Sequence, residues 1–184
     1  MLEIGPGDER IPGFETMDIK ASHWIDYFWD ATRRMPFPDG TFDCIYASHV
    51  IEHIPWYKTK DILVEWVRIL KAGGSLDIWV PDGLKICKAF LDAEAAGNNY
   101  IYRDGWYRFN EERDPCKWFA GRTFSYGDGT GRRRDPNWHL AVFSQRYLQD
   151  LLKGIGLRDV SMLESRDVRG YDHGWINMGV RGVK

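Results

Sequence analysis

The feature that most constrains the fold is a pair of glycines near the start of the chain, followed at a short distance by an acidic residue. An apolar run at residues 2–4 leads into Gly5 and Gly7, with one proline between them. Such a run predicts a strand that feeds a tight turn, where a ligand can lie against backbone amides. A second run, residues 14–19, contains Asp18. In a doubly wound sheet, a carboxylate at this position accepts hydrogen bonds from a ribose, so the two features together predict a nucleotide-type site.

Length and composition predict one globular domain. The chain has 184 residues, of which 43% are hydrophobic, enough for a sizeable core. Its formal charge of -2 gives no general attraction to nucleic acid or to an anionic membrane, which favours a small or neutral partner. We find neither a run of roughly 20 apolar residues nor a basic leader followed by an apolar segment, and therefore expect a cytoplasmic protein without a membrane partner. The oligomeric state is left open.

The three cysteines predict neither a disulfide framework nor a zinc ribbon. Cys44, Cys87 and Cys116 are odd in number and widely spaced. We expect all three to be free thiols, with Cys44 in the core.

The first half of the chain alternates between strand and helix patterns. Strands are predicted at residues 23–29, 42–48 and 75–81, and amphipathic or capped helices at residues 56–70 and 82–96. This order predicts a parallel sheet with right-handed crossovers. Only ten residues separate Gly7 from Asp18, and Pro12 and Gly13 interrupt them, so the usual first crossover helix is expected to be stunted or absent.

The alternation stops at residues 97–138, which contain ten aromatic residues, six glycines and three consecutive arginines. A long irregular insertion in a compact domain is typically a lid or a binding loop, and its aromatic content argues against disorder. Beyond it we predict a helix that begins after Ser144, a strand at residues 157–163 and a last strand at residues 175–183. The last two strands are expected to form an antiparallel hairpin at the sheet edge.

With its motifs in this order, the chain resembles a class I S-adenosylmethionine-dependent methyltransferase, and in particular a compact subgroup of small methyltransferases. The resemblance lies mainly in the first half of the chain, and most of the insertion carries no recognisable signal. It implies a Rossmann-like α/β fold with a mostly parallel sheet, an antiparallel last strand and an aromatic-rich lid, all within one domain, residues 1–184. The matching motifs are Leu2-Glu3-Ile4-Gly5-Pro6-Gly7, Met17-Asp18-Ile19, Asp30-Ala31, Met35-Pro36-Phe37-Pro38-Asp39-Gly40-Thr41-Phe42-Asp43, Ser48-His49-Val50-Ile51-Glu52-His53 and Leu70-Lys71-Ala72-Gly73-Gly74-Ser75-Leu76.

The resemblance also implies which residues bind the cofactor, S-adenosylmethionine. Gly5 and Gly7 would let the backbone approach its methionine and ribose parts. Asp18, with Ile19 beside it, would hold the ribose hydroxyls. Glu3 would order the glycine turn or meet the amino group of the cofactor through water.

The motifs that follow would bind the adenine and the sulfonium end of the cofactor. Asp30 would accept a hydrogen bond from the adenine amino group, and Ala31 would leave space for the flat ring. Ser48 and His49 would line the sulfonium end. The chain departs from the broad family at Glu9, where a third glycine is usual, and in its short first crossover.

Candidate catalytic residues are His49 and His139. Within a helical segment, His49, Glu52 and His53 share one side through their i, i+3, i+4 spacing. Three interpretations stay open for this group: structural hydrogen bonds of Glu52 and His53, which we favour; a divalent ion; and a catalytic base. We therefore assign no metal to the site. His139 directly follows the insertion, within reach of an acceptor, whereas His23 and His173 have no context that suggests a role.

The predicted reaction is methyl transfer to an oxygen of a small molecule or sugar. One alternative is a scaffold protein that binds the cofactor without turnover, suggested by the stunted crossover. Another is a nucleic-acid methyltransferase, suggested by the arginine cluster, although a solvated loop is the preferred interpretation of that cluster. Tryptophans of the insertion either stack on a ring acceptor or pack the lid onto the body. The residues concerned are Arg122, Arg132, Arg133, Arg134, Trp106, Trp118 and Trp138.

Overall fold

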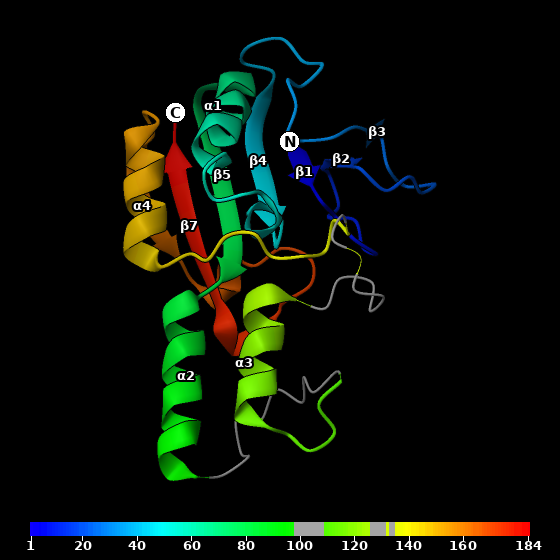
Figure 1. Ribbon diagram of the computed structural model, residues 1–184. Coiled ribbons are helices and arrows are strands. Elements are labelled where there is room, and N and C mark those ends of the chain that lie inside the picture. The colour runs from blue at the N-terminus through cyan, green and yellow to red at the C-terminus, as the bar shows by residue number, and fades with distance from the viewer. Residues whose placement is uncertain (98–108, 126–131, 133–134) are drawn as a thin grey trace.

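The computed structural model describes residues 1–97, 109–125, 132 and 135–184, and one seven-stranded sheet forms its centre (Figure 1). The strand order across the sheet is β3-β2-β1-β4-β5-β7-β6. The strands are β1 (Leu2–Ile4), β2 (Glu15–Asp18), β3 (Tyr27–Phe28), β4 (Phe42–Ser48), β5 (Leu70–Pro81), β6 (Arg158–Leu163) and β7 (Asn177–Val183).

The sheet is parallel from β3 to β5 and antiparallel at its other end. β7 lies between β5 and β6 and runs antiparallel to both. The predicted α/β architecture, with a mostly parallel sheet and an antiparallel last strand, is thereby confirmed. In the parallel part, Ile4 of β1 is level with Met17 of β2 and Ala47 of β4, so these three strands end at the same edge.

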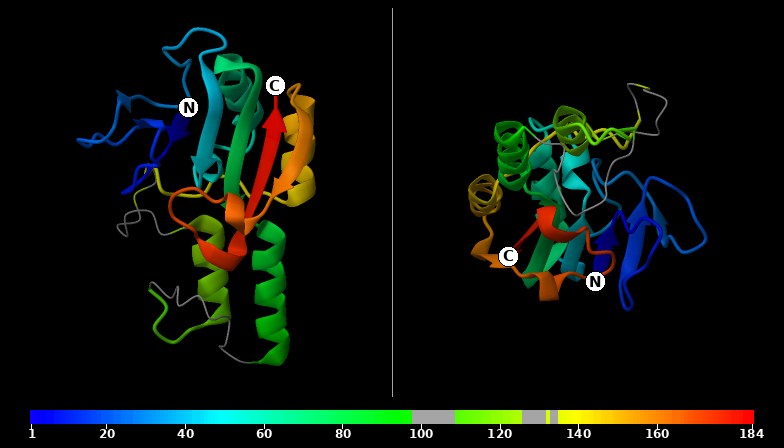
Figure 2. Two further views of the ribbon diagram at one scale, coloured as in Figure 1. Left: turned by 180° about the vertical axis from the view of Figure 1, so that it is seen from behind. Right: turned by 90° about the horizontal axis from the view of Figure 1, so that it is seen from below.

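Two helices cover one face of the sheet. α1 (Thr59–Ile69) follows β4, and α4 (Gln145–Gly154) precedes β6. Their apolar faces, including Trp66 and Leu148, join inward-facing strand residues in the main core. Seen from behind, the strands lie in front of both helices, and none of the described α-helices lies on that second face (Figure 2, left).

Chain connections cover the second face instead. A smaller core of Tyr46, Trp79 and Phe14 lies there, with Val168 packed against it. The hydroxyl of Tyr46 donates to the Arg169 carbonyl at 2.7 Å, which fastens the β6–β7 connection to β4. The short first crossover agrees with its prediction, because no helix forms between β1 and β2.

α2 (Gly83–Ala96) and α3 (Pro115–Phe124) form a pair beyond the sheet edge (Figures 1 and 2). The sequence predicted an irregular insertion and missed α3. Asp114 caps this helix by accepting from the Lys117 amide, Pro115 occupies its first turn, and Trp118 is fully buried in a cluster with residues of α2. Tertiary packing thus supports a helix with a weak pattern of its own.

Several predicted boundaries were wrong. The helix expected from residue 56 begins at Thr59, and the strand expected at residues 23–29 is only Tyr27–Phe28. β5 begins at Leu70 rather than residue 75, because residues 70–74 continue the pairing with β4 through an irregularity and meet Lys184. Short 3-10 turns, η1 (Ile51–His53), η2 (Ser165–Asp167) and η3 (Gly174–Ile176), complete the described elements.

The cysteines are free, as predicted, and Cys44 is buried. Among the helices that the structure describes, none combines the length and apolar character needed to cross a membrane.

Candidate functional site

The predicted glycine turn lies where β1, β2 and β4 end. Gly5 and Gly7 have φ angles of +68° and +64°, in the left-handed region that favours glycine. The Gly5 amide donates to the Met17 carbonyl at 2.9 Å, which holds the turn beside the end of β2. The turn and Asp18, ten residues apart in sequence, therefore meet at one edge.

The two glycines have different surroundings. A Cβ on Gly5 would lie 2.5 Å from a methyl carbon of Val50, so the turn packs tightly against the segment after β4. A Cβ on Gly7 would meet nothing within 4 Å. The backbone at Gly7 faces open space and is accessible to a ligand.

One cavity, of about 260 Å³, lies on the β2 side of the turn. Asp18 there accepts a hydrogen bond from the Lys20 amide at 2.8 Å. Asp30 accepts from both the amide and the hydroxyl of Thr32; partial burial opposes ionisation, but these bonds and Arg33 hold the pKa of Asp30 below its ordinary value. The predicted cofactor residues lining this cavity are Gly5, Asp18, Ile19, Asp30 and Ala31. His53, which the sequence grouped with Glu52, also lines it, and the sequence assigned no cofactor role to Val50, Ile54 or Pro136.

A second cavity, of about 500 Å³, lies on the other side of Gly5. Glu3 lines it and is nearly buried; its Oε2 accepts from the Ile11 amide at 2.9 Å, and burial raises the pKa of this carboxyl. The same bond orders the chain that follows the turn. Gly7, Ser48 and His49 also line this cavity, together with the β6–β7 connection at residues 169–171 and 173.

His49 is held firmly at the end of β4. It has a φ of +55°, and its Nε2 lies 2.8 Å from Oδ1 of Asn177. Its ring stacks on that of His173, with centroids 3.6 Å apart. Burial, followed by the nearby His49, lowers the pKa of His173 to about 4. Sequence reasoning missed His173, because only the antiparallel return of the chain brings it to His49.

A buried group forms where η1 meets residues 138–139. Glu52, His53 and His139 each offer one ligand atom, and these atoms lie within 4.8 Å of one another. The rings of His53 and His139 are in edge contact, with centroids 4.9 Å apart. The predicted grouping of Glu52 and His53 thus gains His139, whereas His49 contacts Glu52 from one side.

Glu52 is 1% exposed. No donor in the described parts of the chain makes an aligned hydrogen bond to either of its oxygens, although Nδ1 of His49 lies 3.1 Å from Oε1. Burial opposes its ionisation, but His49, His53 and His139 together lower the pKa of Glu52 below its ordinary value. Burial, partly offset by Glu52, lowers the pKa of His139 to about 4.

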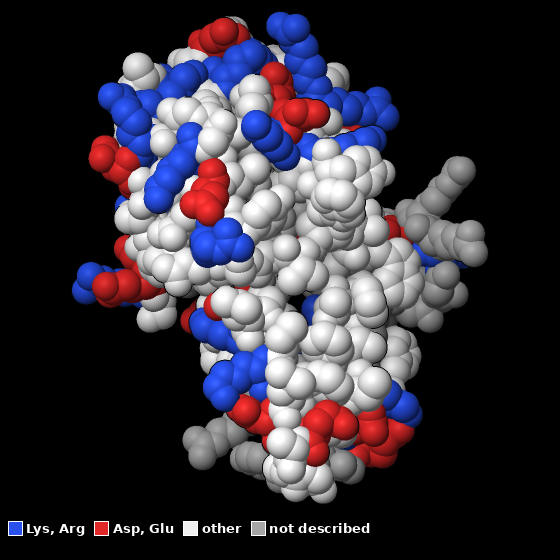
Figure 3. Space-filling model, turned by 60° about the vertical axis from the view of Figure 1, so that its left-hand side comes forward, with Lys and Arg blue, Asp and Glu red and all other residues white. Residues whose placement is uncertain are grey.

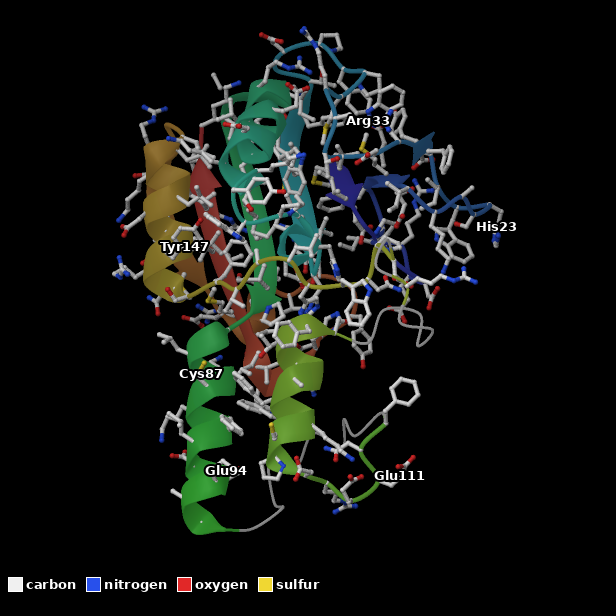
Figure 4. All side chains as sticks on the ribbon, in the orientation of Figure 1. His23, Arg33, Cys87, Glu94, Glu111 and Tyr147 are labelled. Carbon is white, nitrogen blue, oxygen red and sulfur yellow. The ribbon has the colours of Figure 1, made fainter. Side chains whose placement is uncertain are left out.

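Glu52 and His139 also line a third cavity, of about 200 Å³, between the α2–α3 pair and residues 141–143. Its other lining residues are mostly apolar: Pro81, Gly83, Ile86, Cys87, Phe119, Arg122, Thr123, Ala141, Val142 and Phe143. On the side of the molecule where α2 and α4 lie, a largely uncharged band with a hollow separates two charged regions (Figure 3). Cys87 lies on the part of α2 nearest the sheet (Figure 4).

The remaining candidates are dispersed. Trp118 packs inside the α2–α3 pair beneath Arg122, whose Cζ is 5.8 Å from the ring centroid. The Trp138 indole donates to the Arg132 carbonyl at 2.7 Å. His23 lies far out at the β2–β3 end (Figure 4). Arg133, Arg134 and Trp106, named in the sequence predictions, lie outside the described residues.

Comparisons with known proteins give a partial family match and several structures of similar fold. Residues 16–78 match the family described as a methyltransferase domain. None of the curated proteins matches the chain in sequence. Among solved structures, a Thermotoga maritima protein described as an S-adenosylmethionine-dependent methyltransferase and possible histamine N-methyltransferase is 20% identical, with a TM-score of 0.52; the alignment covers 100% of this chain and 81% of that one.

Two further structures share the fold. An S-adenosylmethionine-dependent methyltransferase from Archaeoglobus fulgidus is 14% identical, with a TM-score of 0.53, covering 100% of this chain and 85% of its own. The 1,6-didemethyltoxoflavin-N1-methyltransferase of Burkholderia thailandensis, solved with S-adenosylhomocysteine, is 12% identical, with a TM-score of 0.55, covering 100% and 69%. The chain therefore shares its overall fold with S-adenosylmethionine-dependent methyltransferases, and its residues 16–78 match the methyltransferase-domain family.

Proposed function

We propose that the protein transfers the methyl group of S-adenosylmethionine to an oxygen of a small acceptor with an apolar body. One observation carries this proposal: the segment at residues 48–54 borders all three cavities. Ser48 and His49 line the cavity of about 500 Å³, and Val50 and His53 the cavity of about 260 Å³. Glu52, from the same segment, reaches the apolar cavity.

The cofactor would occupy the two cavities that flank Gly5. In this placement Asp18 accepts from the ribose hydroxyls, and Asp30 and Ala31 border the adenine. Ser48 and His49 lie toward the sulfonium end, with the open backbone at Gly7 beside the methionine part. The shape of the turn supports this placement, because a side chain at Gly7 would project into the open space.

The chemistry asks mainly for alignment and exclusion of water. The cofactor carries its methyl group on a positively charged sulfur. When the methyl group is transferred, the sulfur keeps the electron pair of the C–S bond. Holding the two reactants in line can supply about 7–11 kcal/mol of the barrier. The protein would provide this through residues 48–54, which border the cofactor cavities and the acceptor cavity and could align the two reactants.

A small acceptor with an apolar body fits the third cavity best. Phe119, Ile86 and Phe143 line it, and they offer apolar contact rather than the hydrogen bonds that a sugar needs. Its volume, about 200 Å³, suits a small molecule rather than a nucleic-acid strand. The insertion at residues 97–138 contributes α3 to the wall of this cavity and would act as the acceptor lid.

An oxygen acceptor is favoured by Glu52 and His139 at the inner end of this cavity. A hydroxyl must lose its proton during transfer, and a carboxylate beside a histidine with a lowered pKa is suited to that task. The related proteins include nitrogen and carbon methyltransferases, so the shared fold does not select the acceptor atom.

A product assay tests the proposal. The protein is incubated with S-adenosylmethionine and a panel of small phenols, aromatic alcohols, sugars and aromatic amines, and mass spectrometry detects S-adenosylhomocysteine with the methylated product. We expect products from phenols or aromatic alcohols. Exclusive methylation of amines would discard the oxygen assignment. Cofactor binding without any product would favour the non-catalytic alternative, and RNA binding that weakens steeply with salt would favour a nucleic-acid substrate.

A further inference from the structure

We propose that Glu52, His53 and His139 bind a divalent transition-metal ion such as Zn²⁺ at the inner end of the apolar cavity. The role of this ion toward the acceptor rests on the proposed function, whereas its binding does not. The sequence pattern favoured hydrogen bonds for Glu52 and His53. The arrangement of protons around Glu52 leads to a different conclusion.

Each nearby histidine directs one ring nitrogen at an oxygen that only accepts. Nε2 of His49 faces Oδ1 of Asn177, whose own Nδ2 donates to Asp172 and so fixes the orientation of the amide. Nδ1 of His53 lies 3.2 Å from the Trp138 carbonyl. His139 donates to the Arg122 carbonyl. A neutral imidazole has a single N–H; where that proton goes to the carbonyl or amide oxygen, the other ring nitrogen offers a lone pair to a metal ion.

The consequence is an electron-rich group around a buried carboxylate. Glu52 is 1% exposed and receives no aligned hydrogen bond from any described donor. A buried charge without a partner costs several kcal/mol, so it is retained where a cation or a dense set of donors compensates it. A metal ion supplies that charge. Histidine ligands that donate their other nitrogen to a backbone carbonyl are characteristic of metal sites, which matches His53 and His139.

The ligand chemistry selects the class of metal. Two imidazoles and one carboxylate suit Zn²⁺, Co²⁺ or Fe²⁺, whereas Mg²⁺ and Ca²⁺ prefer oxygen ligands alone. The candidate atoms lie within 4.8 Å of one another. Tetrahedral ligands at Zn–N distances of about 2.0–2.1 Å are roughly 3.4 Å apart, so the ligand atoms would approach one another by up to about 1.4 Å around the ion.

Three protein ligands leave a coordination position for another oxygen. Glu52 and His139 line the apolar cavity, so that position faces the proposed acceptor. A hydroxyl bound to the ion would have a lowered pKa and release its proton to water. Its oxygen would then form the new O–CH₃ bond while the C–S bond breaks and sulfur retains the electron pair. His139 thereby acts on the acceptor through the metal.

Binding of Co²⁺ to the full chain, without cofactor or acceptor, tests the site directly. After treatment with a chelator and dialysis, the protein is titrated with Co²⁺ and followed by visible absorption, and Zn²⁺ competition is followed by calorimetry. We expect one equivalent of Co²⁺, with the intense visible bands of a four- or five-coordinate ion, displaced by Zn²⁺. Glu52→Gln and His139→Gln should each weaken binding at least tenfold, and His23→Gln, at an exposed and distant histidine, should bind as the wild type does.

Two results would overturn the proposal. One is a wild type that binds no Co²⁺ or Zn²⁺ in this way. The other is equal binding by Glu52→Gln, His139→Gln and the wild type, once thermal melting has shown that both variants are folded. Methyl transfer by a protein without the Co²⁺ signal would remove this inference alone, and a clear Co²⁺ signal without methyl transfer would remove only the proposed function.

Discussion

Gly5 shows how closely the turn after β1 packs against the segment after β4. Gly5→Ala would place a Cβ 2.5 Å from Val50 in a backbone with φ +68°. Left-handed strain costs about 1–2 kcal/mol and overpacking about 1–3 kcal/mol, so we expect the free energy of unfolding to fall by roughly 2–5 kcal/mol. Urea denaturation measures the loss.

Gly73→Ala is the matched control, because Gly73 has φ +78° and a Cβ there would meet nothing within 4 Å. It should show the strain alone, about 1–2 kcal/mol. Equal losses in the two variants would mean that Val50 moves aside without cost.

Asp18 is the residue on which the proposed ribose contact depends. Asp18→Asn keeps an oxygen for the Lys20 amide but removes the charge and one acceptor. A hydrogen bond to a charged group contributes about 1.5–3 kcal/mol, so affinity for S-adenosylhomocysteine should fall roughly 10- to 150-fold. Calorimetry measures this change. Asp150→Asn, on an exposed carboxylate of α4 near Arg146, should leave the affinity unaltered, and an unaltered Asp18→Asn would place the ribose elsewhere.

Arg68 fastens the loop before β4 to helix α1. Its guanidinium donates to the carboxylate of Glu65 and to the carbonyls of Met35 and Phe37. The hydrogen bond from Arg68 holds the pKa of Glu65 below its ordinary value. A carboxyl with a lowered pKa in the folded state stabilises the protein above its unfolded pKa, and this contribution is lost as pH falls through the folded value.

Arg68→Gln should therefore reduce the free energy of unfolding by about 1–2 kcal/mol at pH 7, and the difference from the wild type should shrink as pH falls below about 4. Denaturation at several pH values checks both parts. Lys71→Gln, which removes a solvent-exposed pair with Asp43, should leave the free energy of unfolding nearly unchanged. A difference for Arg68→Gln that does not depend on pH would exclude Glu65 as its cause.

The α2–α3 pair has a core of its own. Trp118 is buried there with Ile86, Ala89 and Ala93, apart from the main core of the sheet. Trp118→Ala should loosen this pair while leaving the sheet folded, because the turn with Gly5 and Asp18 lies in other elements. We expect faster proteolysis within α3, affinity for S-adenosylhomocysteine within about twofold of the wild type, and a large loss of product.

Leu91→Ala is the control for this prediction, since Leu91 is exposed on α2. It should leave all three measurements near their wild-type values. A parallel loss of cofactor affinity and product in Trp118→Ala would instead mean that the helix pair and the sheet unfold together.

Local sequence patterns were sufficient to predict those parts of the fold that depend on neighbouring residues. The strand before Gly5, the position of Asp18 and the short first crossover follow from neighbouring residues. α3 could not be predicted in this way, because Trp118 stabilises it through contact with another helix. Likewise, His139 lies beside Glu52, and His173 stacks on His49, although the residues of each pair are far apart in the sequence. The individual motifs of the candidate site could therefore be recognised in the sequence, but which of their residues lie together in space could not be predicted.

The two faces of the sheet are covered differently, and this affects the cofactor cavity. Helices cover one face, whereas the β6–β7 connection lies over the other (Figure 2). Arg169 in that connection donates its amide to the Tyr46 hydroxyl at 3.0 Å and places its guanidinium over the Phe14 ring. The same stretch, through Gly170 and His173, lines the cavity beside Gly7. The contacts that hold the β6–β7 connection over the second face of the sheet therefore also shape the cavity.

Tyr46→Phe tests this dependence. It removes the two hydrogen bonds to Arg169 while keeping the buried ring, so we expect the free energy of unfolding to fall by about 1–2 kcal/mol. Trypsin should cleave the connection faster, and affinity for S-adenosylhomocysteine should drop several-fold because one wall of the cavity is less ordered. Tyr147→Phe, on α4 (Figure 4), should change none of these. If Tyr46→Phe is cleaved faster but binds the cofactor as the wild type does, the connection covers the sheet without shaping the cofactor site.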